Sequence, residues 1–301
     1  MNRGRWKAWV ALAVPILAWG LSFPSIKAAL TEFPPMTLAL GRFVLASAFL
    51  GLVNLARRKA ELRTKWTNRD KGALLLSVLT GITAYFLCEN HGVKLIPATA
   101  ASLIIAGIPI LTLIAERLVH GTRLGLLGIA AAVVSLAGVG LLSGVSGSED
   151  SGNVWGYVLM LGAAGSWVLY LFAMKPLQNG HSNLQVTFWQ MTVGALSLVP
   201  FALAELPDWR WPSVAGWSHL AFQGLVCSAS SYLLYNYALN KLGRGAASLA
   251  VNLIPVVTAA AAYVLLGELL GPWQWAGGAL VLVAVLAVGI KDTLSSRPDS
   301  L

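Results

Sequence analysis

The sequence predicts an all-α polytopic membrane protein with ten transmembrane helices, arranged as two inverted five-helix repeats. Of the 301 residues, 57% are hydrophobic and only 11% are charged, whereas a soluble domain carries roughly 25% charged residues. The apolar residues come in blocks of about 20, the length that a helix needs to cross the hydrocarbon core. A ten-residue pattern from the first half of the chain also recurs in the second half.

The apolar blocks follow one another so closely that no soluble domain fits between them. They lack the apolar–polar alternation of a transmembrane β-barrel. We therefore interpret each block as one helical span. In chain order the predicted spans are 8–30, 35–55, 72–91, 98–118, 124–144, 154–174, 183–203, 217–239, 247–267 and 273–291.

The first span follows the basic residues Arg3, Arg5 and Lys7, as the apolar core of a signal peptide does. Its apolar run is too long for that core and has no clear cleavage site, so we expect it to be retained. The second span contains Arg42, which is the one lysine or arginine inside any of the ten spans. Arg42 is expected either to snorkel toward the membrane surface or to bind a carboxylate through a bidentate fork.

The third span ends in Glu89, Asn90 and His91, and the eighth holds Asn236 among three tyrosines. The fourth and ninth spans contain Pro109 and Pro255, which are expected to break these helices and to serve in gating. A helix inside a membrane tolerates proline where neighbouring groups satisfy the freed carbonyls. Charged and polar groups inside a membrane are costly, so each is a candidate functional residue.

Lysine and arginine predict the orientation. If the N-terminus is cytoplasmic, 17 basic residues fall in cytoplasmic segments and three in outer loops, namely Lys27, Lys94 and Arg210. Both termini are therefore predicted to be cytoplasmic.

The two halves of the chain share a pattern. Ala100-Ala-Ser-Leu-x4-Ile-Pro109 returns as Ala246-Ala-Ser-Leu-x4-Ile-Pro255, with six of ten positions identical at an offset of 146. Five spans per copy make the second copy enter the membrane from the opposite side, and inverted repeats of this kind build transporters. We predict one integral bundle, with repeats at residues 1–147 and 148–301.

These residues resemble a known family. Trp19-Gly20-x2-Phe23 with Lys27, the repeated Ala-Ala-Ser-Leu-x4-Ile-Pro, and Gly267-Glu268 followed by Gly277 resemble the drug/metabolite transporter superfamily, in particular its EamA-type ten-helix members. The aromatic content is similar to that of the YddG-type amino acid exporters. The resemblance implies a bacterial-type inner-membrane location and a central cavity lined by spans 1–4 and 6–9. One departure is Gly121-Thr122, where the second copy has Gly267-Glu268.

The predicted substrate site is an aromatic cavity with a few amide contacts. An alternative is that the same side chains only pack helices or anchor the membrane interface. The candidate substrate-binding residues are Trp19, Tyr85, Asn90, Trp167, Tyr170, Gln190, Tyr232 and Asn236. Glu89 and His91 are candidate proton-coupling residues because both titrate and lie together at the outer end of the third span. A pair exposed to water there would titrate without coupling, so facilitated exchange is favoured over proton antiport.

Other functions fit poorly. The basic residues form no continuous face for nucleic acid, and Cys88 and Cys227 lie apart in apolar segments, which excludes a disulfide framework or metal cluster. No phosphate-binding loop motif is present. Gly144-Val-Ser146-Gly147 has the shape of a serine protease motif but lies in a loop, so no catalytic residue and no cofactor are predicted.

We therefore predict a secondary transporter, a monomer or weak dimer in the lipid bilayer, that exports small amphipathic metabolites by alternating access. Neutral or aromatic amino acids are the favoured cargo. A broad drug or metabolite exporter is the main alternative, and a passive channel is a further one.

Overall fold

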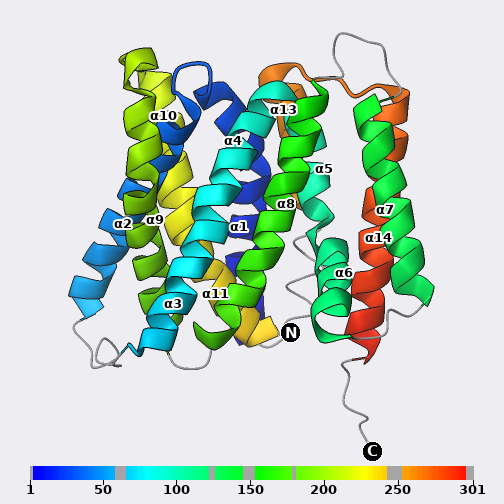
Figure 1. Ribbon diagram of the computed structural model, residues 1–301, viewed down its shortest axis with the longest axis horizontal. Coiled ribbons are helices and arrows are strands. Elements are labelled where there is room, and N and C mark those ends of the chain that lie inside the picture. Colours follow the sequence, from blue (N-terminus) through cyan, green and yellow to red (C-terminus); the bar gives the residue numbers. More distant parts are fainter. Residues whose placement is uncertain are drawn as a thin grey trace, which may run out of the picture.

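The protein is a bundle of helices. A computed structural model describes residues 3–57, 66–121, 126–144, 153–177, 181–242 and 253–295. Within these ranges every regular element is helical (Figure 1), which confirms the all-α prediction. Six stretches are long and apolar enough to cross a membrane: Trp6–Ala29, Pro35–Ala56, Asn68–Leu95, Ala98–Val119, Val154–Leu177 and Asn183–Ala204.

Three further apolar helices are shorter within the described residues: Leu126–Val139, Ile254–Leu266 and Pro272–Ala287. The predicted ninth span is described only from residue 253 onward, so the second Ala-Ala-Ser-Leu run lies outside the described residues. The count of ten spans and the inverted relation of the two halves stay predictions.

The first half of the chain forms seven α-helices and one π-helix. Their bounds are α1 Arg3–Ala29, α2 Pro35–Arg57, α3 Asn68–Val78, η2 Leu79–Ala84 (π-helix), α4 Tyr85–Leu95, α5 Ala98–Ala106, α6 Ile108–His120 and α7 Leu126–Gly144. The elements α3, η2 and α4 are continuous and together make the third predicted span. The fourth predicted span is α5 and α6, which are separated at Gly107.

The second half has a similar order of elements. Their bounds are α8 Val154–Met174, the 3-10 turn η4 Lys175–Leu177, α9 Asn183–Ala204, the 3-10 turn η5 Leu206–Asp208, α10 Val214–Ala221, η6 Phe222–Ser230 (π-helix), α11 Ser231–Leu242, α13 Ile254–Leu266 and α14 Pro272–Ser295. Each half therefore carries a π-helix in its third predicted span.

The two proline-containing helices begin and end alike. Pro109 and Pro255 lie within the first two residues of α6 and α13, where a proline costs little because the first amides have no partner inside the helix. Both helices have 13 residues and end at a left-handed glycine, Gly121 with φ 65° and Gly267 with φ 66°. Glycine takes this conformation without the steric cost that a Cβ brings. A gating role for the two prolines stays a prediction.

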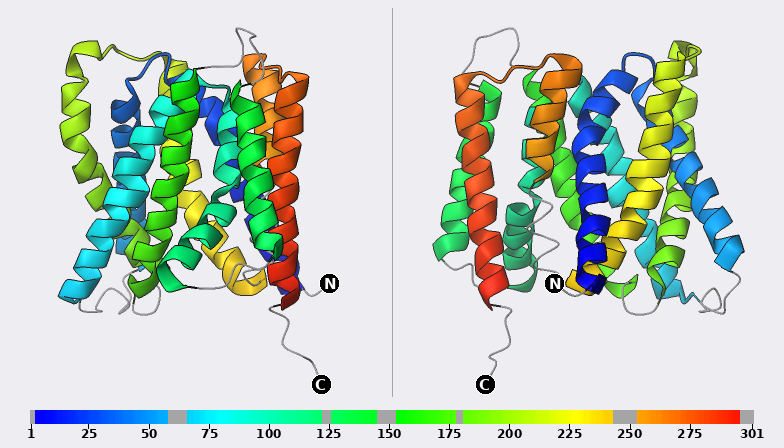
Figure 2. Two further views of the ribbon diagram at one scale, coloured as in Figure 1. Left: turned by 45° about the vertical axis from the view of Figure 1, so that its right-hand side comes forward. Right: turned by 180° about the vertical axis from the view of Figure 1, so that it is seen from behind.

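The helices of the two halves interleave. In the packing, α1 lies against α11 and α13, α2 against α9, and α4 against α8. The remaining pair, α7 and α14, pack on each other at one side of the bundle (Figure 2). A Cβ on Gly138 of α7 would lie 2.7 Å from the carbonyl oxygen of Gly277 in α14, so glycine permits this close approach.

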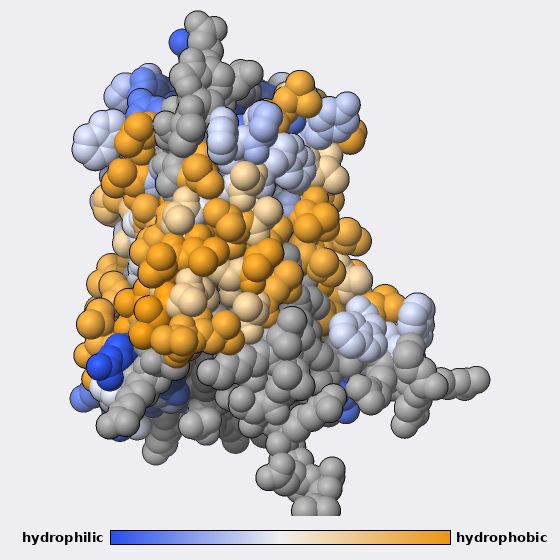
Figure 3. All heavy atoms as spheres, turned by 90° about the vertical axis from the view of Figure 1, so that its right-hand side faces the viewer, coloured by the Kyte–Doolittle hydropathy of each residue, from blue (hydrophilic) through white to orange (hydrophobic). Residues whose placement is uncertain are grey.

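The surface of the bundle suits a membrane. Around α7 and α14 apolar side chains form a broad band, with polar residues near its upper and lower edges (Figure 3). Large apolar side chains exposed on these two helices are Leu126, Ile129, Val133, Leu136, Val283 and Leu286. The first residue of α1 and the last of α14 lie at the same end of the bundle (Figure 1), as an even number of crossings requires.

Candidate functional site

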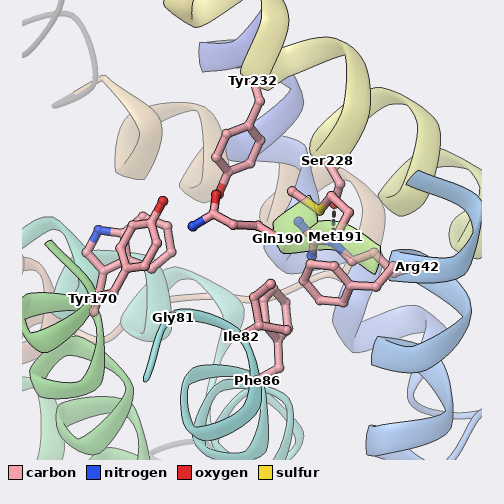
Figure 4. A pocket seen from close by; sticks show the side chains of 11 residues that line it. Arg42, Gly81, Ile82, Phe86, Tyr170, Gln190, Met191, Ser228 and Tyr232 are labelled. Atoms are coloured by element: carbon pink, nitrogen blue, oxygen red, sulfur yellow. Dashed lines mark hydrogen bonds between the residues drawn. The ribbon is translucent and has the colours of Figure 1, made fainter. Parts of the chain in front are cut away.

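A cavity lies inside the bundle, with side chains from both halves of the chain around it (Figure 4). It holds about 350 Å³ of empty space, part of which is open to solvent. The lining side chains come from α2, η2, α4, α8, α9, η6 and α11, and α7 and α14 contribute none. They are Arg42, Phe43, Gly81, Ile82, Phe86, Trp167, Tyr170, Gln190, Met191, Ser228 and Tyr232.

Aromatic rings form much of the wall. Trp167 packs against Tyr170 and Tyr85 of α4, with ring centroids 4.7 Å and 5.1 Å apart. Tyr232 packs edge-on against Trp19 of α1 at 5.8 Å. Trp167, Tyr170 and Tyr232 thus line the cavity, as predicted, while Trp19 and Tyr85 lie behind the lining rings.

The π-helix η2 brings the backbone close to the ring of Tyr170. A Cβ on Gly81 would overlap this ring, so only glycine permits the approach. The ring of Tyr170 therefore lies directly against the turn of η2 that lines the cavity (Figure 4).

Gln190 of α9 adds an amide to the lining. Its Nε2 donates to Ser77 Oγ at 3.1 Å and approaches the Met174 sulfur at 2.9 Å. These contacts fix the side chain, which is 5% exposed. The predicted polar contact is thus brought to the cavity.

The two asparagines are placed differently from our expectation. Asn90 is 1% exposed and donates through Nδ2 to the carbonyl oxygen of Pro35 at 2.7 Å, which ties α4 to the first residue of α2. It does not line the cavity. Asn236 belongs to α11, but its side chain lies outside the described residues.

Arg42 points into the bundle, so the expectation that it snorkels to the membrane surface is wrong. Its side chain is 8% exposed, its Nε donates to Ser228 Oγ at 2.6 Å, and its guanidinium lies 4.9 Å from the centre of the Phe86 ring. The sequence carried one signal for this site, because Arg42 is the only cation inside a predicted span. The roles of Gly81, Phe86 and Ser228 were missed.

Glu89 and His91 do not form a pair. Glu89 is 4% exposed and accepts a hydrogen bond from the Tyr85 hydroxyl at 2.8 Å, while its Oε2 has no hydrogen-bond partner. His91 instead contacts the carbonyl oxygen of Leu87 through Nδ1 at 2.8 Å. Residues two apart point to nearly opposite sides of a helix. The expectation of a water-exposed pair is therefore wrong for Glu89, which is buried.

Two segments of the chain, residues 6–144 and 154–290, match the model of the EamA-like transporter family. The chain belongs to this family. The match confirms the resemblance to the drug/metabolite transporter superfamily that the sequence motifs indicate, and the protein is a transporter of this family.

Relatives are similar over almost their whole length. A probable terminal-alkyne amino-acid exporter from Streptantibioticus cattleyicolor is 28% identical, over 98% of this chain and 97% of the relative. The uncharacterized inner membrane transporter YedA from Escherichia coli is 26% identical, over 96% and 92%. A protein crystal structure that is 20% identical has the same fold, with a TM-score of 0.64 over 96% of this chain and 99% of that one. The EamA-like transporter studied here is thus a multi-pass membrane protein.

Proposed function

We propose that this transporter exports small amphipathic metabolites, in particular neutral and aromatic amino acids, by alternating access across a bacterial inner membrane. The cavity that carries this proposal is lined by rings from both halves of the chain and by one cation, Arg42. Rings bind apolar side chains through burial and ring packing, and the cation suits a carboxylate. The printed name of the Streptantibioticus relative, an amino-acid exporter, supports the same cargo.

Alternating access would use two inverted five-helix repeats, residues 1–147 and 148–301, with both termini in the cytoplasm. The π-helix η2 in the first half and η6 in the second occupy similar places in the order of elements. The helices α6 and α13 begin at Ile108 and Ile254, 146 residues apart. Two similar halves have similar energies when they exchange conformations, which is the physical basis of alternating access.

Counterflow in proteoliposomes tests this proposal. Vesicles are preloaded with phenylalanine, leucine, alanine or the amphipathic cation tetraphenylphosphonium, and uptake of the labelled compound is followed. We expect saturable exchange of phenylalanine and leucine. Exchange of the cation alone would indicate a broad drug exporter, and flux that does not saturate would indicate a channel, so either result would contradict the proposal.

A pair of glycine variants provides a matched control. Gly81→Val places a side chain against Tyr170 in the cavity, whereas a Cβ on Gly72 meets nothing within 4 Å. Gly81→Val should therefore abolish most exchange, and Gly72→Val should leave it near the wild-type rate. Equal effects of the two variants would argue that substrate does not pass through this cavity.

A further inference from the structure

Arg42 is a buried cation that no carboxylate pairs with. Its side chain is 8% exposed, and among the residues that the structure describes no carboxylate oxygen lies within 4.0 Å of its guanidinium. Its Nε bonds to Ser228, but Nη1 and Nη2 have no hydrogen-bond partner in the described part of the chain. Burying a charged donor without a partner is expensive.

The surroundings hold the guanidinium in place without using these donors. Ser228 of η6 fixes the Nε edge, and the ring of Phe86 lies alongside at 4.9 Å. A planar guanidinium fixed along one edge presents its remaining N–H groups as a fork. Figure 4 shows Arg42 among the lining side chains of the cavity, beside Ser228 and Met191 and across it from Tyr170.

We propose that Arg42 binds the carboxylate of the transported molecule through Nη1 and Nη2, while the apolar remainder of that molecule packs against the aromatic wall. This proposal rests on the proposed function, because it names the chemical class that the same cavity accepts. Cargo must carry a carboxylate, and an amine of the same size and shape is rejected.

The charges around the cavity agree with this assignment. Arg42 is the one formally charged side chain among the lining residues. The nearest acid on the adjoining helix, Glu89, is held by the Tyr85 hydroxyl and acts on Arg42 only through space. The corresponding position in the second half, at an offset of 148, is Gln190, which also lines the cavity. One half thus offers a charged fork where the other offers an amide.

The test compares three ligands that share a phenyl ring. Phenylalanine has a carboxylate and an ammonium group, 3-phenylpropionate has only the carboxylate, and phenethylamine has only the ammonium group. Binding to the purified full-length protein is measured by ligand-induced thermal stabilisation, and counterflow is measured in parallel. Wild-type protein should bind both carboxylates and bind phenethylamine at least about 10-fold more weakly.

Three variants isolate the role of Arg42. Arg42→Gln installs the residue of the second half, and Arg42→Gln combined with Glu89→Gln keeps the net charge of the site in case the single variant folds poorly. Both should lose roughly 10- to 100-fold in affinity for the two carboxylates and should no longer discriminate against phenethylamine. Lys94→Gln removes an exposed cation on α4 and should bind all three ligands as wild type does.

Two outcomes would contradict one proposal each. If the double variant keeps the wild-type preference for carboxylates, or if wild type binds neither carboxylate, the assignment of Arg42 is wrong. If carboxylates bind in an Arg42-dependent way but no amino acid is exchanged, the assignment stands and the proposed export of amino acids fails.

Discussion

At the residue scale, the rings of the cavity should set the preference among substrates. Trp167 and Tyr232 line the cavity from the two halves, and a substrate ring that packs on one of them gains about 0.5–1.5 kcal/mol beyond area burial. Trp167→Ala and Tyr232→Ala should therefore weaken phenylalanine binding by roughly that amount more than alanine binding. Competition for counterflow measures both affinities.

The control for this prediction is Trp189→Ala. Trp189 neighbours Gln190 in sequence, but its side chain is 41% exposed on the outside of the bundle and should not affect the preference. Equal loss of phenylalanine and alanine binding in the cavity variants would mean that the two rings only pack the helices.

A second prediction concerns Glu89. A bound carboxylate and an ionised Glu89 would repel each other while both interact with Arg42, so removing the charge should favour the substrate. Glu89→Gln is expected to raise phenylalanine affinity at least about 5-fold, as a coupling free energy of 1 kcal/mol or more implies. Isothermal titration of the purified variant measures the change.

His91→Asn is the matched control, because His91 bonds to its own helix on another face. It should leave both the affinity and the response to a pH gradient unchanged. Unchanged affinity in Glu89→Gln, or a changed affinity in His91→Asn, would contradict this account of the pair.

The polar residues show how far sequence reasoning reached at this scale. Trp167, Tyr170, Gln190 and Tyr232 were predicted because aromatic and amide side chains inside apolar spans need partners, and they line the cavity. Asn90 satisfies the same rule by capping nothing in the cavity and bonding to Pro35 instead. A pattern states that a polar group needs a partner, but the tertiary fold decides whether that partner is a helix or a ligand.

At the element scale, a carboxylate after α13 holds the beginning of α5. Glu268 accepts hydrogen bonds from the amides of Ala98 at 3.0 Å and Thr99 at 3.4 Å, and it pairs with Lys27 Nζ at 2.9 Å. Lys27 also donates to the carbonyl oxygen of Ile96 at 2.8 Å. A negative charge is favourable at the positive end of a helix. Lys27 thus joins α1 to this cap rather than acting only as an interfacial anchor.

A double-mutant cycle tests this cap. Glu268→Gln should lower the free energy of unfolding by about 1 kcal/mol, because it weakens the cap and the ion pair. Combined with Lys27→Met, its effect should be less than additive, with a coupling of about 0.5–3 kcal/mol. Thermal and denaturant unfolding in detergent provide the measurements.

The control pairs Lys27→Met with Glu205→Gln. Glu205 caps a different helix, since it accepts hydrogen bonds from the amides of Met36 and Thr37 in α2, and it does not contact Lys27. These two effects should add. Additivity in the Lys27 and Glu268 cycle would show that the observed pairing contributes nothing to stability.

The elements themselves were largely predictable, but their irregularities were not. Apolar blocks located the helices because a span must be apolar over its full length, and prolines located the beginnings of α6 and α13. The π-helices η2 and η6 had no sequence signal. They depend on tertiary contacts, such as the approach of Tyr170 to Gly81, which no local pattern contains.

At the scale of the whole molecule, the orientation in the membrane is the broadest prediction. The charge distribution favours cytoplasmic termini, with 17 basic residues on one side and three on the other. The first residue of α1 and the last of α14 lie at one end of the bundle, so both termini should face the same compartment. The same arrangement requires the loop between α7 and α8 to lie on the opposite side.

Single cysteines test this orientation in intact cells. Cys88 and Cys227 are first replaced by serine or alanine, since both are free thiols. Ser148→Cys, in the loop between α7 and α8, should react with an impermeant maleimide added outside. Ser295→Cys, at the end of α14, should react only after the membrane is permeabilised. Because every crossing reverses the side, labelling of both from the same side would require an odd number of crossings to be gained or lost between them. That result would overturn the ten-span arrangement and the inverted repeat with it.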